Sequence, residues 1–174
     1  MTIYQSLWVK VALGGTFDPL HEGHKRLIRK AFGIGKDVVF GVTSDEMARR
    51  KFRRVLPYNL RVRNLKDYVK RTYGVDVRVE KIFDIYGRTI DEDFDIIIVS
   101  PETYENARKI NEKRIEIGKE PITIVVVDFV LAYDGKPISA TRIKNGEIDR
   151  FGFRLSQDTY DLGSYPTPPT LRLG

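Results

Sequence analysis

Both histidines of the chain fall in one short, glycine-rich segment. Residues 14–24 read GGTFDPLHEGH, with His21 and His24 on either side of a glycine. Glycine lets the backbone approach a ligand closely, and a helix that begins near Glu22 points its free N–H groups and its positive dipole at an anion. His24 would then stand in the first turn of this helix. The segment therefore has the outline of a phosphate-binding site.

The spacing within residues 14–24 excludes the commonest phosphate and metal motifs. The Gly-Lys-Ser/Thr ending of a P-loop and the Gly-x-Gly-x-x-Gly spacing of a dinucleotide loop are both absent. The two histidines stand three residues apart, whereas a zincin helix spaces them by four. With no cysteine, the chain has neither a thiolate nucleophile nor a cysteine-built zinc site, and we predict no metal held by protein ligands. The alternative is a tight strand-to-helix turn with two incidental surface histidines.

A second candidate segment reads ISATRIK, at residues 138–144. Ser139 and Thr141 open a short stretch with apolar spacing, so the N-terminus of a helix there can present hydroxyl and N–H groups to the β- and γ-phosphates of a nucleotide. Arg142 adds a positive charge. The alternative is an ordinary helix cap with an exposed charged face, and this segment taken alone favours that alternative.

A basic segment at residues 49–71 concentrates positive charge beyond the net charge of +6. Its ten lysines and arginines stand against the single acid Asp67. Such a patch suits a nucleic acid, a polyphosphate substrate or merely a solvated helix face. Few aromatic residues suited to base stacking accompany it, and no nucleic-acid recognition motif. We therefore expect no nucleic-acid partner, but a nucleic-acid-binding protein using residues 49–71 remains a competing hypothesis from a different class.

The hydrophobic pattern predicts the elements that must position these residues. Strands alternate with helices, which is typical of an α/β domain with a parallel sheet and helices on both faces. Ligands of such a sheet bind beyond the carboxyl ends of the strands where the strand order reverses. The predicted strands are residues 7–13, 37–42, 75–82, 95–99 and 122–128, and the predicted helices are residues 22–33, a short helix from 44, 58–73 and 101–117.

Length and composition indicate one globular domain. A chain of 174 residues with 41 % hydrophobic content can bury one core of normal size, and no apolar run approaches the length of a membrane helix. The first residues lack the features of a secretion signal, so we expect a cytoplasmic protein without a membrane partner. We assign residues 1–152 to the domain. Residues 153–174 contain three closely spaced prolines and are predicted to be a poorly ordered tail.

The two candidate segments together resemble a known superfamily. Residues 15–24 resemble the His-x-Gly-His signature of the nucleotidyltransferases, and residues 138–144 resemble their second signature, of the Ile-Ser-Ser-Thr-x-Arg type. With TSDEM, VLPY and VSPET in between, residues 7–150 resemble the archaeal and eukaryotic type of phosphopantetheine adenylyltransferase. Residue 140 is alanine where serine is common. Residues 100–103 read SPET in place of the Arg-Gly-Leu-Arg of the bacterial enzymes, whose binding arginines therefore do not carry over.

The resemblance implies a fold, a reaction and partners. We expect a single Rossmann-like nucleotidyltransferase domain with a mostly parallel five-stranded sheet in the order 3-2-1-4-5. The implied reaction is transfer of the adenylyl group of ATP to 4′-phosphopantetheine, giving dephospho-coenzyme A and pyrophosphate, with Mg²⁺ as the cofactor that accompanies ATP. Adenylyl or cytidylyl transfer to nicotinamide mononucleotide, flavin mononucleotide or glycerol phosphate is the alternative, because all these enzymes share the signatures. The sequence leaves the oligomeric state open and slightly favours a monomer.

The resemblance also implies roles for individual residues. His24 and Lys51 would be catalytic, with Thr16 and Lys51 binding the phosphorylated acceptor. Arg50 or Arg53 is an alternative to Lys51, and Ser100 could instead cap the next helix. The residues expected at ATP are Gly14, Thr16, Phe17, His21, His24, Ser100, Glu102, Ile138, Ser139, Thr141 and Arg142.

Overall fold

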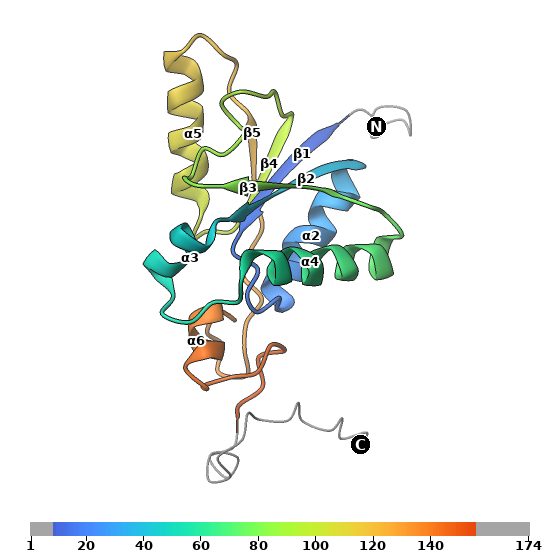
Figure 1. Ribbon diagram of the computed structural model, residues 1–174, viewed down its shortest axis with the longest axis vertical. Coiled ribbons are helices and arrows are strands. Elements are labelled where there is room, and N and C mark those ends of the chain that lie inside the picture. Colours follow the sequence, from blue (N-terminus) through green and yellow to red (C-terminus); the bar gives the residue numbers. More distant parts are fainter. Residues whose placement is uncertain (1–8, 156–174) are drawn as a thin grey trace.

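A five-stranded parallel sheet forms the centre of the computed structural model, which describes residues 9–155 (Figure 1). Its strand order, β3-β2-β1-β4-β5, is the predicted one, and all four pairings are parallel. The order reverses between β1 and β4, so a crevice is expected at the carboxyl ends of these two strands. The strands are β1 (Lys10–Gly15), β2 (Asp37–Thr43), β3 (Arg78–Ile82), β4 (Ile96–Val99) and β5 (Thr123–Val126).

Most of the predicted helices agree with the structure, because local capping signals set their ends. Ser44 caps α3 through its side chain, and Gly74 ends α4 with a left-handed φ of 70°. The helix predicted from residue 101 begins later, at Tyr104, because residues 101–103 form a turn instead. The helices are α2 (Glu22–Ile34), α3 (Asp45–Lys51), α4 (Tyr58–Tyr73), α5 (Tyr104–Glu116) and α6 (Ala140–Lys144).

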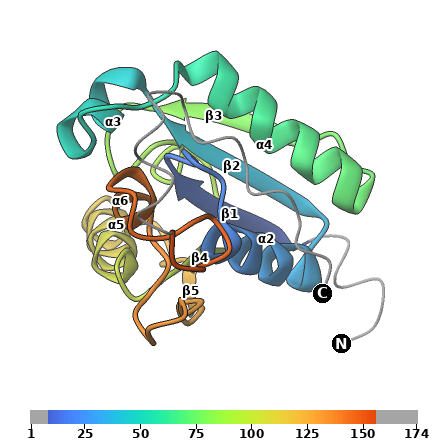
Figure 2. The ribbon, with the colours of Figure 1, turned by 90° about the horizontal axis from the view of Figure 1, so that it is seen from below.

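Helices cover both faces of the sheet, as predicted. Val11 and Leu13 of β1 pack in one core cluster with residues of α2 and α4, while Ala12, between them, packs in a second cluster with residues of α5. Successive side chains of a strand point to opposite faces, so the two clusters lie on the two sides of the sheet. Accordingly, α2 and α4 lie on one side and α5 lies apart from them in both views (Figures 1 and 2).

A small unit formed by α6 and the turn that follows it has its own apolar cluster and lies beyond the carboxyl ends of the strands. Ile148 is fully buried in its apolar cluster, and Ile148 pairs with Arg154 in an antiparallel bridge. The N–H of Glu22 donates to the carbonyl of Arg150 at 3.2 Å, which joins this turn to the start of α2. The unit thereby places α6 close to the histidine segment.

The domain boundary predicted after residue 152 falls inside this turn. The N–H of Asp149 donates to the carbonyl of Phe153, and the N–H of Leu155 donates to the carbonyl of Glu147. Residues 156–174, which make up most of the predicted tail, lie outside the described residues, so their poor order stays a prediction. Within residues 9–155, no helix is long and apolar enough to cross a membrane.

Candidate active site

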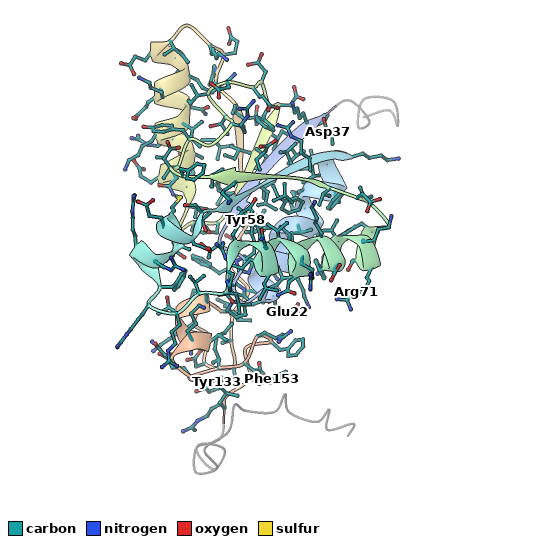
Figure 3. All side chains as sticks on the ribbon, in the orientation of Figure 1. Glu22, Asp37, Tyr58, Arg71, Tyr133 and Phe153 are labelled. Atoms are coloured by element: carbon teal, nitrogen blue, oxygen red, sulfur yellow. The ribbon has the colours of Figure 1, made fainter. Side chains whose placement is uncertain are left out.

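A cavity of about 290 Å³ lies at the carboxyl ends of β1 and β4, where the strand order reverses. It brings the two predicted motifs together, although they are far apart in the chain. Figure 3 shows Glu22 and Tyr58, at the starts of α2 and α4, near this end of the sheet and far from Asp37 at the start of β2. The predicted site residues that line the cavity are Gly14, Thr16, Phe17, His21, His24, Lys51, Ser100, Glu102, Ile138, Ser139 and Thr141.

His21 and His24 cap the start of α2 reciprocally. The N–H of Gly23 donates to Nδ1 of His21 at 3.0 Å, and the N–H of His21 donates to Nδ1 of His24 at 3.3 Å. The two rings stack with centroids 3.8 Å apart. A Cβ atom on residue 23 would stand 2.7 Å from Cε1 of His21, so only glycine fits beside this ring.

Both imidazoles are neutral at pH 7, and the caps decide which nitrogen carries the proton. Burial lowers the pKa of His21 to about 4. Burial, with smaller electrostatic effects of Lys51 and of His21 once His21 is protonated, lowers the pKa of His24 well below its usual value. Because each Nδ1 accepts a backbone hydrogen bond, the single proton of each neutral ring is on Nε2. The site therefore offers two Nε2–H donors, and both residues line the cavity.

Lys51 and Glu102 form an ion pair at the cavity, which the sequence did not predict. Nζ of Lys51, on α3, lies 2.6 Å from Oε1 of Glu102, in the loop after β4, and both side chains are more than half exposed. The alternatives to Lys51 are less well placed. Arg50 is exposed and pairs with Glu46 on its own helix, and neither Arg50 nor Arg53 lines the cavity.

Ser139 caps α6, with its Oγ accepting from the N–H of Arg142 at 3.2 Å, so the cap that the sequence left open as an alternative is present. Arg142, however, is not brought to the cavity lining. Its guanidinium is held at Asp134 and Glu147, with N–O distances of 2.5 and 2.9 Å. The hydroxyl groups of Ser139 and Thr141 are thus the polar side chains that α6 and its cap bring to the site.

Ser100 shares its hydrogen bonds with the turn that precedes α5. Its N–H donates to Oγ1 of Thr103 at 3.1 Å, and the two hydroxyl oxygens lie 3.3 Å apart. The helix begins only after Thr103, so Ser100 is not its cap. Both residues line the cavity.

Asp18 is a buried residue of the site to which the sequence assigned no role. Its Oδ2 accepts from the N–H of Leu56 at 2.7 Å and from Nζ of Lys144 at 3.1 Å. The carboxylate therefore joins the first motif, the segment before α4 and the second motif. Asp18 and Lys144 both lie within the predicted motif segments, but nothing in the sequence indicated that they pair.

Arg61 is one of the ten basic residues counted in residues 49–71, but it does not belong to the exposed positive charge. Its side chain is fully buried, with 0 % exposure, whereas the other lysines and arginines of this segment are exposed. Oδ1 of Asp45 lies 2.8 Å from its Nη2. The period of α4 could have revealed this, because Arg61 shares its face with the buried Leu65 and Val69.

No group of three or more His, Cys, Asp or Glu side chains within residues 9–155 could hold a metal ion. Three carboxylate residues line the cavity: Asp18 and Glu102 are each paired with a lysine, and Asp128, after β5, is exposed. The donors around the cavity, namely imidazole N–H, hydroxyl and ammonium groups, are suited to an anion rather than to a bare cation.

Comparisons with known proteins find related sequences over most of the chain. Residues 12–146 match the family model described as cytidylyltransferase-like. The phosphopantetheine adenylyltransferase of Archaeoglobus fulgidus is 60 % identical over 145 residues, which are 83 % of this chain and 98 % of that protein. The enzyme of the same name from Methanosarcina mazei is 52 % identical over 154 residues, covering 86 % of this chain and 98 % of that one. A crystal structure of an Archaeoglobus fulgidus protein of unknown function is similar with a TM-score of 0.67 and 58 % identity, covering 69 % of this chain and 90 % of that one.

Proposed function

Because the chain belongs to the cytidylyltransferase-like family, we propose that it is a nucleotidyltransferase that transfers the adenylyl group of ATP to 4′-phosphopantetheine. The products are dephospho-coenzyme A and pyrophosphate, which places the enzyme in coenzyme A biosynthesis. One observation carries the proposal: residues of two motifs far apart in the sequence line one cavity at the strand-order reversal. The similarity spans nearly the whole length of the named relatives, which supports the same acceptor.

The reaction suits a site without a nucleophilic side chain. A phosphate monoester is mostly dianionic at neutral pH, so the acceptor's own oxygen can attack the α-phosphorus of ATP and displace pyrophosphate. The protein's task is to hold the groups in line and to stabilise the charge that grows on the phosphoryl oxygens. Nε2–H of His24, with that of His21 beside it, is the donor we assign to the α-phosphoryl group, and Thr16 is the donor at the junction of the two substrates.

Lys51 and the second motif supply the remaining contacts. We assign Lys51 to the phosphate of the acceptor, which would replace Glu102 as the anionic partner of Nζ. Ser139 and Thr141 are assigned to the β- and γ-phosphates. We assign Mg²⁺ mainly to the triphosphate and water, because no cluster of three or more carboxylate or imidazole side chains within residues 9–155 could hold it, and the ion would supply positive charge to the departing pyrophosphate.

Incubation with Mg-ATP and a panel of phosphorylated acceptors tests the proposal, with products identified by mass. We expect dephospho-coenzyme A and pyrophosphate from 4′-phosphopantetheine. Adenylation of nicotinamide mononucleotide, flavin mononucleotide or glycerol phosphate in preference to 4′-phosphopantetheine would reassign the acceptor. No turnover on any acceptor, with DNA or RNA affinity that falls steeply with salt and ignores ATP, would favour nucleic-acid binding instead.

A further inference from the structure

Arg61 reaches from α4 to the residues directly behind the cavity. Its Nη1 donates to the carbonyl of Thr16 and to Oγ1 of Thr43, each at 3.2 Å. Its Nε donates to the carbonyl of Leu56 at 2.8 Å, and its Nη2 donates to Asp45 at 2.8 Å. A buried guanidinium thus contacts the loop after β1 and the last residue of β2, on which the geometry of the site depends.

The hydrogen bonds of this group have a defined direction. A guanidinium only donates, so Oγ1 of Thr43 accepts from Arg61. The single hydroxyl hydrogen of Thr43 then points to Oγ1 of Thr16, at 3.0 Å. Thr16 therefore accepts at its oxygen from behind, and its own hydroxyl hydrogen remains to be donated. Within residues 9–155 the bond to Thr43 is the one hydrogen bond of the Thr16 hydroxyl, and Thr16 lines the cavity.

From the direction of these hydrogen bonds we propose that Arg61 and Thr43 are positioning residues. They orient the Thr16 hydroxyl so that it donates a hydrogen bond to a phosphate oxygen in the cavity. The inference rests on the proposed adenylyl transfer, because it needs an anion at Thr16. A free hydroxyl can turn to donate or to accept, but only donation stabilises a phosphoryl oxygen. A hydroxyl already oriented before the reaction needs no reorganisation when charge grows there, so the effect is expected in kcat rather than in KM.

Thr43→Val isolates this effect, because valine has nearly the shape of threonine but no hydroxyl. Arg61 keeps its acceptors at Thr16, Leu56 and Asp45 in this variant, so the buried charge stays partnered. Thr43→Ser keeps the hydroxyl and serves as the matched control. The Thr16→Val variant removes the donor on which Thr43 is proposed to act.

We expect Thr43→Val to lower kcat about 10-fold, with KM for both substrates within about twofold of that of the parent protein. Thr43→Ser should restore most of kcat. In the Thr16→Val background, Thr43→Val should have little further effect, since the group that it orients is gone. Equal losses of kcat with and without the Thr16 hydroxyl would overturn the proposal, as would an unchanged kcat in Thr43→Val.

A failure of the proposed function is distinguishable from a failure of this inference. If the parent protein does not adenylate 4′-phosphopantetheine, the proposed function fails, whatever the Thr43 variants do. A neutron structure of the full chain reads the hydrogen direction without any turnover. A deuterium bonded to Oγ1 of Thr43 and pointing to Thr16 supports the inference, and one bonded to Thr16 and pointing to Thr43 overturns it.

Discussion

Two buried arginines lie at opposite ends of the same sheet. Arg61, with 0 % exposure, contacts residues at the carboxyl ends of β1 and β2, while Arg114, with 2 % exposure, contacts residues that precede β4 and β5. Each guanidinium donates to backbone carbonyls and to one carboxylate. For Arg114 these are the carbonyls of Thr89, Glu92 and Glu120 and the carboxylate of Asp93.

The two arginines differ in where their acceptor residues lie. The partners of Arg61 include Thr16 and Thr43, and Thr16 lines the cavity, whereas the partners of Arg114 only close loops at the far end of the sheet. Charges at that far end also neutralise one another. The carboxylate of Glu92 accepts from Lys10, Arg78 and Arg88, which hold its pKa well below the usual range. Burial of a charge therefore does not by itself indicate a role at the site, and the role we propose for Arg61 rests on its contacts beside the cavity.

Removal of a donor at the cavity should have the largest effect. His24→Ala should lower kcat roughly 10²- to 10³-fold, about 3 to 4 kcal/mol in the barrier, and weaken ATP binding far less, because the Nε2–H donor acts most strongly when charge peaks on the α-phosphoryl group. Steady-state kinetics with both substrates measure this. His24→Asn serves as the control, since its side-chain oxygen can still accept from the N–H of His21. A normal kcat in either variant would contradict the role of His24.

Matched substitutions test whether only the arginine beside the cavity affects turnover. Arg61→Met and Arg114→Met should each lower the free energy of unfolding by about 3 kcal/mol, because buried carbonyls lose their donors. Only Arg61→Met should also lower kcat, by about 10-fold. Chemical denaturation and kinetics on the same samples separate the two effects. Arg108→Met is the exposed control on α5, with an expected change within about 0.5 kcal/mol. Loss of kcat in a folded Arg114→Met protein would contradict the proposed difference between the two arginines.

A smaller effect is expected at the mouth of the cavity. Lys51→Ala should raise KM for the phosphorylated acceptor about 10-fold and change KM for ATP less, since one charge-assisted hydrogen bond to the acceptor's phosphate is lost. Arg50→Ala, which removes an exposed charge one residue away, should leave both KM values unchanged. If only KM for ATP rises in Lys51→Ala, the lysine belongs to the ATP subsite.

The last prediction concerns pH rather than a substitution. His21 and His24 are the two histidines of the chain, so an NMR titration observes each without overlap. We expect a midpoint of about 4 for His21 and one well below 6.5 for His24, both measured on the folded protein. Because the unfolded chain binds these protons near pH 6.5 and the folded chain does not, the free energy of unfolding should fall as the pH drops from 6.5 towards 4. A midpoint near 6.5 for either residue would contradict the buried, neutral pair.

Local signals were sufficient for the order of the elements but not for every bound: β1 spans Lys10–Gly15, whereas the prediction was residues 7–13. α4 has the predicted bounds, residues 58–73, because a proline precedes it and Gly74 ends it, and Ser139 forms the helix cap that the sequence offered as an alternative. Each depends on neighbours within one or two helical turns. The loop after β1 was also predictable as a site, since its glycines and both histidines are contiguous in the chain.

The partners of individual charges were decided only by the tertiary structure. The sequence placed Arg61 in a surface patch, and its burial depends on acceptors as far away as Thr16, 45 residues earlier. Arg142 was expected at the phosphates, but the carboxylates of Asp134 and Glu147 hold it elsewhere. Lys51 meets Glu102, 51 residues later. A charged side chain is directed by the field of every group that the fold brings within a few ångströms, and hydrophobic period and capping patterns contain no information about those long-range neighbours.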